Sequence, residues 1–126
     1  MQRKENAVPE IVDICRLDDI PTGQIRQFKV GQKEIAIART GPSDCYAIGG
    51  RCTHRGAPLG QGKLEGTVVT CPWHGSQYDV TTGKLLRWVQ QPRWMKVLAG
   101  LMPPFLRHDA PAYQVRIADG QVSVEI

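Results

Sequence analysis

Two short segments of the sequence each carry one cysteine and one histidine. Cys52 and His54 are separated by one residue, Cys71 and His74 by two, and all four fall within 23 residues. The chain has only four cysteines and three histidines, so chance is a poor explanation for this concentration. Zinc and iron–sulfur clusters favour thiolate ligands, and imidazole binds zinc or iron. The two segments therefore predict a metal site.

The spacing within each segment bears on which metal is bound. The side chains of a Cys-x-His triplet cannot easily wrap around one ion, but they can reach two metal atoms that bridging sulfides hold apart. One iron would then take both cysteines and the other both histidines, which is the ligation of a Rieske [2Fe–2S] centre. A zinc site with the same four ligands is the alternative, although zinc usually pairs cysteines two to four residues apart and histidines three to five residues apart.

Both segments resemble the two cluster-binding boxes of the Rieske family. They read CTHRGAPL at 52–59 and CPWHGSQYD at 71–79. Further similarity to soluble Rieske ferredoxins lies in Leu17–Pro21, in Leu64–Gly66 and in the Asp119–Gly120 turn. The resemblance implies one [2Fe–2S] cluster as the cofactor, with the two cysteines and two histidines of the boxes as its ligands.

The resemblance also implies the fold. We expect an all-β protein with a single Rieske domain over residues 1–126, in which 10–44 and 87–126 form a β-sandwich base and about 45–86 form an inserted cluster-binding β-hairpin subdomain. Alternating apolar residues bounded by turn residues predict strands. These strands are 11–16, 25–30, 34–39, 45–48, 67–70, 77–80, 84–88 and a C-terminal hairpin around Asp119–Gly120. The glycine-rich residues 49–66 fit no regular element.

Residues beside the ligands differ from those of the Rieske subunits of cytochrome bc complexes. Those subunits carry an extra cysteine in each loop, and the matching residues here are Ala57 and Trp73, so the bracing disulfide cannot form. Ser76 and Tyr78, however, match residues whose hydroxyls in that class donate hydrogen bonds to a bridging sulfide and to a ligand sulfur. Such donors stabilise the reduced form. We therefore expect a potential within about −150 to +300 mV and above that of typical oxygenase-type ferredoxins, which often lack both hydroxyls.

The remaining residues of the boxes are expected to shape the surroundings of the cluster. Gly56 and Gly75 would let the backbone turn tightly, so that amide N–H groups can point at the sulfides. Pro58 and Leu59 would form an apolar collar. Trp73 would shield the cluster from water by its bulk.

A segment outside the boxes, residues 90–106, is longer than we expect for this family. Its apolar residues predict a short helix near 93–101, which Gly100 and Pro103 limit to about two turns. Pro92 would cover the cluster from a third side, as a proline-containing loop does in the family.

The net charge of +4 comes entirely from residues 84–108, which hold five basic and no acidic residues. Two uses of this segment remain open. It packs on the base with its basic side chains solvated, or it docks an acidic redox partner, with Arg51 and Arg55 extending a basic rim beside the first box. An anionic membrane surface is a third alternative, which we do not expect. The charge is too mild to favour nucleic acid.

Composition and cysteine use indicate a cytoplasmic globular protein. The hydrophobic content of 41% and the charged content of 22% are ordinary. No apolar run approaches the length of a membrane helix, and no secretory signal follows the first residues. We therefore expect reduced thiols in a cytoplasm. Cys15 and Cys45 lie within predicted strands and are expected to be small buried hydrophobes, and His108 a surface residue.

Together these features predict one-electron transfer without a catalytic site. We expect a ferredoxin, or the small Rieske subunit of a larger oxidoreductase, that passes electrons from a reductase to a terminal oxidoreductase. A regulatory or structural redox-sensing module and a zinc-binding domain are the alternatives. An oxygenase would need a further iron site with two histidines and one carboxylate, and His108 is the one histidine left over.

Overall fold

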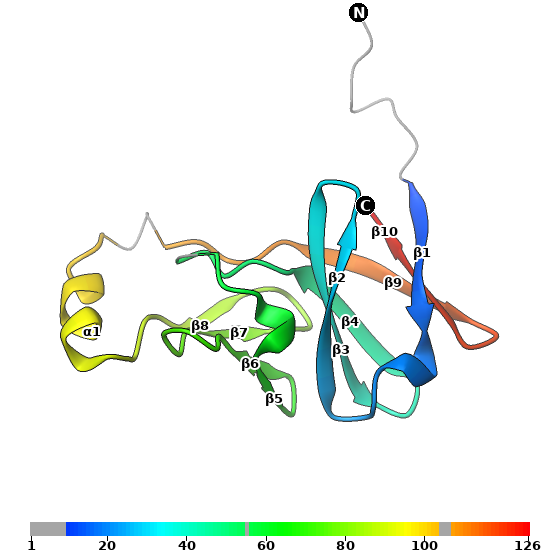
Figure 1. Ribbon diagram of the computed structural model, residues 1–126, viewed down its shortest axis with the longest axis horizontal. Coiled ribbons are helices and arrows are strands. Elements are labelled where there is room, and N and C mark those ends of the chain that lie inside the picture. The colour runs from blue at the N-terminus through cyan, green and yellow to red at the C-terminus, as the bar shows by residue number, and fades with distance from the viewer. Residues whose placement is uncertain (1–9, 55, 104–106) are drawn as a thin grey trace, which may run out of the picture.

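The computed structural model describes residues 10–54, 56–103 and 107–126. Strands in these residues form two antiparallel sheets (Figure 1). The six-stranded sheet has the order β1 (Ile11–Arg16), β10 (Gln121–Glu125), β9 (Ala112–Ala118), β4 (Asp44–Gly49), β3 (Lys33–Gly41), β2 (Gln24–Val30). The four-stranded sheet has the order β5 (Lys63–Glu65), β6 (Val68–Thr70), β7 (Gln77–Asp79), β8 (Leu85–Arg87). Two short 3₁₀ turns, η2 (Leu17–Asp19) and η3 (Leu59–Gln61), and the helix α1 (Arg93–Gly100) complete the described elements.

The six-stranded sheet curls so that its two halves enclose a core. Cys15 of β1 and Val122 and Val124 of β10 belong to the same buried cluster as Ile35 and Ile37 of β3. These strands lie in opposite halves of the strand order, so their side chains can meet only if the sheet closes on itself. The curled sheet is the β-sandwich base that the sequence predicts.

Strand β3 is buried on both faces and joins the two halves of the molecule. Its run Ile35–Ala38 is inaccessible to solvent. Successive residues of a strand point to opposite faces. Ile35 and Ile37 therefore face the core of the curled sheet, while Ala36 and Ala38 face a second core shared with the ligand loops. The small alanine side chains let this second layer approach the sheet closely.

The second core lies between the base and the four-stranded sheet. Tyr78 of β7 and the buried Cys52 and Cys71 belong to it. The chain at Gly60 passes so close to β2 that a Cβ atom there would lie 2.3 Å from the backbone nitrogen of Gln27. The loops that carry the candidate ligands are therefore positioned by direct packing on the base.

The observed fold confirms the all-β prediction, and two details differ. Residues 49–66 are not wholly irregular, because they contain η3 and the strand β5, which pairs with β6. The sequence also predicts 45–86 as one inserted subdomain, whereas β4 pairs with β3 and β9 in the six-stranded sheet. The sequence of strand β5 gives little indication of a strand, because only Leu64 of its three residues is partly buried.

Helix α1 lies at the opposite end of the molecule from β1 (Figure 1). It confirms the short helix predicted near 93–101. One side of the helix packs through Met95 and Ala99 against Trp88 and Val89. Among the described residues, no helix is both long enough and apolar enough to cross a membrane.

Candidate metal centre

Both predicted ligand loops adopt the same backbone turn. In each loop the cysteine N–H donates to the carbonyl of the fifth residue after it, and the N–H of the glycine four residues after the cysteine donates to the cysteine carbonyl. These N···O distances lie between 2.7 and 3.2 Å. The glycines, Gly56 at φ +77° and Gly75 at φ +78°, are left-handed, a conformation that other residues adopt only with strain. Two copies of one turn thus hold the four candidate ligands.

The two glycines have the tight turn that the sequence predicts, but their own N–H groups do not point at a cluster. The N–H of Gly56 donates to the carbonyl of Cys52 at 2.8 Å, and that of Gly75 donates to the carbonyl of Cys71 at 3.2 Å. Both amides are therefore used in closing the turn. The spacing Cys-x-x-x-Gly occurs in both segments, and it is the sequence signal from which the shared turn could have been predicted.

The four candidate ligands come together as two pairs. The thiols of Cys52 and Cys71 are both buried, and the Cys52 thiol together with burial raises the pKa of Cys71. The rings of His54 and His74, both half-buried, lie edge to face with their centroids 5.1 Å apart. In the part of the chain that the structure describes, no three His, Cys, Asp or Glu side chains group together as a metal site. A pair of thiols and a pair of imidazoles is the ligand set of a Rieske-type cluster, whose sulfides complete each iron.

One buried hydroxyl in the second loop has no partner within the described protein. Ser76 is completely buried, and its Oγ makes no hydrogen bond to any described residue. Leaving a buried polar group unsatisfied costs about 1–3 kcal/mol. A sulfide beside the second loop would accept the Ser76 proton, which is the role that the resemblance implies. The residues present therefore fit a [2Fe–2S] cluster at this position.

The hydroxyl of Tyr78 lies in a small network beside Cys52. Its Oη is 3.4 Å from Cys52 Sγ and 2.8 Å from Thr53 Oγ1, and it accepts the N–H of Thr53 at 3.1 Å. Thr53 Oγ1 donates to the carbonyl of His108 at 2.7 Å. Burial raises the pKa of the Tyr78 phenol, so the hydroxyl keeps its proton. The predicted contact of Tyr78 with a cysteine sulfur is present, but Thr53, which the sequence does not single out, is a second acceptor for the same proton.

A buried tryptophan contacts a candidate ligand without being predicted to do so. The ring of Trp88 lies edge to face against His54 with the centroids 5.2 Å apart, and its Nε1 donates to the Ala99 carbonyl of α1 at 3.1 Å. Trp73, expected to shield the cluster, is 53% exposed, and its shielding role stays a prediction. No local signal points to Trp88, because it follows His54 by 34 residues.

Arg51 ties the first ligand loop to the base. Its guanidinium is ion-paired with Glu34 of β3 and donates to the Gly56 carbonyl at 2.9 Å. The hydrogen bond from Arg51 holds the pKa of the Glu34 carboxyl below its usual value. The positive charge of Arg51 is therefore largely neutralised by Glu34 and does not enlarge a basic docking rim. Arg55, the other residue of that expected rim, lies outside the described residues.

The segment before Pro92 is held against the second ligand loop. The N–H groups of Gln90 and Gln91 both donate to the carbonyl of His74, at 2.7 and 3.1 Å. Pro92 thus follows directly on residues that touch a candidate ligand. Its role as a third wall of the cluster stays a prediction.

The other predicted residues lie in environments that match their expected character. Leu59 is completely buried in the second core and Pro58 is half-buried, although the collar they would form stays a prediction. Cys15 and Cys45 are buried thiols as expected. Burial raises the pKa of Cys15 to about 11 and also raises that of Cys45. His108 is exposed, which confirms it as a surface residue.

Comparison with known proteins supports the same identification. The sequence matches the model of the Rieske [2Fe-2S] domain over residues 10–103. It is 43% identical over 75 residues to the ferredoxin component of naphthalene 1,2-dioxygenase/salicylate 5-hydroxylase systems of Ralstonia sp., covering 60% of this chain and 71% of that protein. Ferredoxin CarAc of Metapseudomonas resinovorans is 39% identical over 71 residues, which cover 56% of this chain and 65% of that protein. The match to mouse apoptosis-inducing factor 3, at 35% identity, covers 57% of this chain and 12% of that protein.

Solved structures share the fold over most of the chain. The ferredoxin of carbazole 1,9a-dioxygenase from Nocardioides aromaticivorans IC177 gives a TM-score of 0.72 at 24% identity, covering 94% of this chain and 98% of that one. A chain from the complex of reduced oxygenase and oxidized ferredoxin in carbazole 1,9a-dioxygenase gives 0.69 at 28% identity, covering 91% and 92%. With ligand pairs, fold and most of its length in agreement, the chain belongs to the Rieske [2Fe-2S] domain family.

Proposed function

We propose that this protein is a Rieske ferredoxin that carries single electrons from a reductase to the terminal oxygenase of a multicomponent dioxygenase system. Its relatives include the ferredoxin components of naphthalene and carbazole dioxygenase systems. The observation that carries the proposal is the pair of buried thiols and the pair of half-buried imidazoles on two matching turns.

In this proposal the four ligand side chains have two roles. Cys52 and Cys71 would hold one iron, and His54 and His74 would hold the other. When bound, the [2Fe–2S] cluster supplies reversible one-electron transfer, and imidazoles in place of two thiolates raise its potential. Because the two histidines are half-buried while the cysteines are buried, electrons would leave on the histidine side.

We further propose that the protein works in the cytoplasm as an electron carrier with no catalytic centre of its own. All four cysteines are thiols in the structure, as a reducing compartment would keep them. In carbazole 1,9a-dioxygenase, a ferredoxin of the same fold forms a complex with a separate oxygenase. Fractionation of cells that produce the protein would test the location, and recovery outside the cytoplasm would contradict it.

Metal and sulfide analysis of the purified protein tests the proposed site. We expect iron and acid-labile sulfide in equal amounts and an EPR signal that appears on one-electron reduction. Cys52→Ser and His54→Asn should lose the cluster or change its spectrum. Cys45→Ser and His108→Asn are the matched controls and should keep both the cluster and its spectrum, since Cys45 belongs to the core of the curled sheet and the His108 side chain is exposed. Zinc without sulfide would contradict the proposal.

The electron relay is tested separately from the site. Chemically reduced protein is mixed with the purified terminal oxygenases of the naphthalene and carbazole systems, and its reoxidation is followed by absorbance. Reoxidation faster than by buffer alone supports a ferredoxin role. A cluster that exchanges no electrons with reductase or oxygenase would favour the redox-sensing alternative.

A further inference from the structure

Helix α1 presents an apolar face to solvent. Trp94, Val97, Leu98 and Leu101 stand at i, i+3, i+4 and i+7, so they line one side of the helix and its C-terminal end. Each of them is at least 60% exposed. They are four of the seven large hydrophobic side chains that are exposed among the described residues. Monomeric proteins rarely leave such side chains contiguous and uncovered, which makes this face a candidate docking surface.

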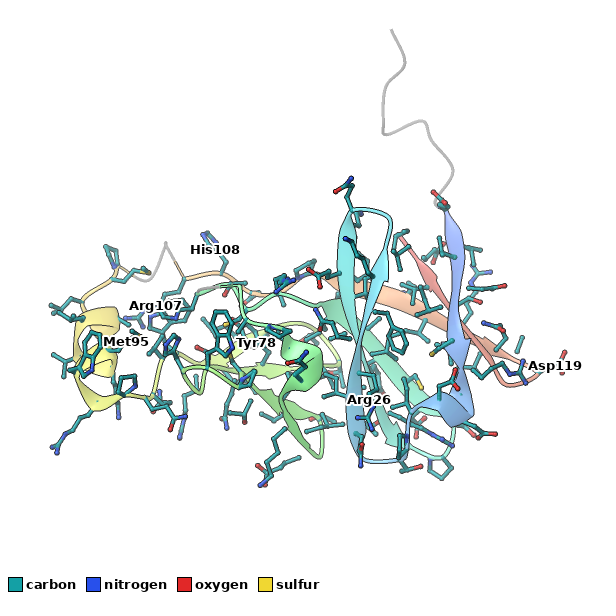
Figure 2. The ribbon with its side chains drawn as sticks, viewed as in Figure 1. Arg26, Tyr78, Met95, Arg107, His108 and Asp119 are labelled. Carbon is teal, nitrogen blue, oxygen red and sulfur yellow. The ribbon has the colours of Figure 1, made fainter. Side chains whose placement is uncertain are left out.

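The protein itself uses a different side of the same helix. Met95 and Ala99 pack toward Trp88. The hydrogen bond from Trp88 Nε1 to the Ala99 carbonyl holds the helix in one orientation about its axis. Arg107 donates to the carbonyls of Gly100 and Met102, both at 3.1 Å, and holds the C-terminal end of the helix. Figure 2 shows Met95 on the helix and Arg107 on the segment that returns from it. Turning α1 to bury its outer face would break these bonds.

Exposed basic side chains lie on α1 and on the segment before it. Arg93 and Lys96 are exposed on α1, and Lys84 and Arg87 are exposed on the segment before it. Residues 84–108 contain no acidic side chain to balance them. A partner whose apolar groove is rimmed by carboxylates would be attracted to this surface and oriented on it.

The docking face is connected to a candidate ligand through one side chain. Trp88 bonds to α1 at Ala99 and its ring contacts the imidazole of His54, with centroids 5.2 Å apart. The guanidinium of Arg107 lies over the Trp88 ring, 5.8 Å from its centroid. An occupant of α1 would therefore lie on the side of the molecule where electrons leave in the proposed function. This connection favours a protein that receives electrons over a lipid surface or a second copy of this chain.

We propose that the apolar face of α1 is the docking surface for the terminal electron acceptor, a protein that presents an apolar groove rimmed by acidic side chains. This inference rests on the proposed function. The recognition mode is an amphipathic helix in a groove. Trp94 is the expected anchor, because buried tryptophans dominate the binding energy of many interfaces.

Site-specific crosslinking identifies what occupies the face. Photoreactive p-benzoylphenylalanine replaces Val97 in one version of the full chain and Ile11 in a control version, since Ile11 is 48% exposed on β1 at the opposite end. We expect an adduct with an iron-containing oxygenase from position 97 and none from position 11. Adducts with a second copy of this chain, with a reductase, or with no protein overturn the proposal.

Electron-transfer kinetics with the captured oxygenase then test the energetics. Trp94→Ser and Leu98→Ser should each raise the KM for the ferredoxin at least tenfold, while the EPR spectrum and potential stay as in the original protein. Ile11→Ser, the matched control, should leave the KM unchanged. Raising the salt concentration should weaken docking of the original protein, because the exposed basic side chains of residues 84–96 would be screened.

The outcomes separate this inference from the proposed function. If the original protein transfers electrons and the α1 variants transfer them equally well, the docking surface is refuted and the ferredoxin function stands. If the original protein transfers no electrons to any oxygenase, the proposed function itself fails. If the original protein sediments with phosphatidylglycerol vesicles and Trp94→Ser does not, α1 binds a membrane surface and the proposal is overturned.

Discussion

The phenol oxygen of Tyr78 can be removed while the packing around the ring is kept, since Tyr78→Phe leaves the buried aromatic ring in place. A hydrogen bond to a charged acceptor contributes about 1.5–3 kcal/mol. The hydroxyl lies 3.4 Å from Cys52 Sγ, and Thr53 Oγ1 competes for the same proton at 2.8 Å. We therefore take about 1 kcal/mol as the difference between the reduced and oxidised states. At about 59 mV for each tenfold change in a one-electron equilibrium, the potential should fall by about 40 mV.

A count of protons shows that Thr53 sets how strongly Tyr78 acts on the sulfur. Thr53 Oγ1 has one proton and donates it to the carbonyl of His108. It can then only accept at its contact with Tyr78, which draws the phenol proton away from Cys52. Thr53→Val removes this acceptor while keeping the backbone N–H bond to Tyr78 Oη. The potential should therefore rise in Thr53→Val, opposite to its fall in Tyr78→Phe.

Protein-film voltammetry measures both shifts, and iron content and Tm show whether each variant is folded and loaded. Opposite shifts cannot come from a general loosening of the site, which would move both potentials in the same direction. An unchanged potential in a fully loaded, stable Tyr78→Phe protein would refute the reasoning, because the hydroxyl would then not donate to sulfur. A fall in Thr53→Val would refute the proton count alone.

Three further predictions follow from other side chains. Ser76→Ala should also lower the potential by about 40 mV in the same assay, because its Oγ has no described protein partner; no shift would exclude a bond to sulfide. At pH 8, DTNB should modify neither Cys15 nor Cys45 in the native protein and both in guanidinium, since burial raises the pKa of Cys15 to about 11 and the protonated thiol is inert. Trp88→Phe should speed trypsin cleavage after Lys96 about fivefold by removing the bond that holds α1; an unchanged rate would contradict that role.

Local patterns were sufficient to predict most strands and the candidate ligands. In β9 the partly buried apolar side chains alternate with exposed ones, and in β10 Val122 and Val124 are completely buried, as the alternation on either side of Asp119–Gly120 indicates. The two cysteines and two histidines stand out because few other residues of these types exist in the chain. Such signals depend only on neighbours in sequence, and so they survive without knowledge of the fold.

The features that the sequence did not predict depend on long-range packing. Trp88 meets His54, and Arg51 meets Glu34, only after separate strands have been brought together. Strand β5 is defined by its partner β6 and not by its own side chains. For the same reason the sequence could not predict that one apolar face of α1 is exposed. An amphipathic pattern does not say which of two apolar sides of a helix the rest of the chain covers.

The position of β3 between two cores has a consequence for how the molecule comes apart. Its isoleucines serve the curled sheet and its alanines serve the layer that carries the ligand loops. Neither layer can detach without exposing one face of the same strand, so the two should unfold as one cooperative unit. Amide exchange in β3 and in the ligand loops should then share one opening free energy, and early exchange of the loops alone would contradict this. Iron would be retained until the entire domain unfolds, so loss of the cluster and loss of the fold would be a single event.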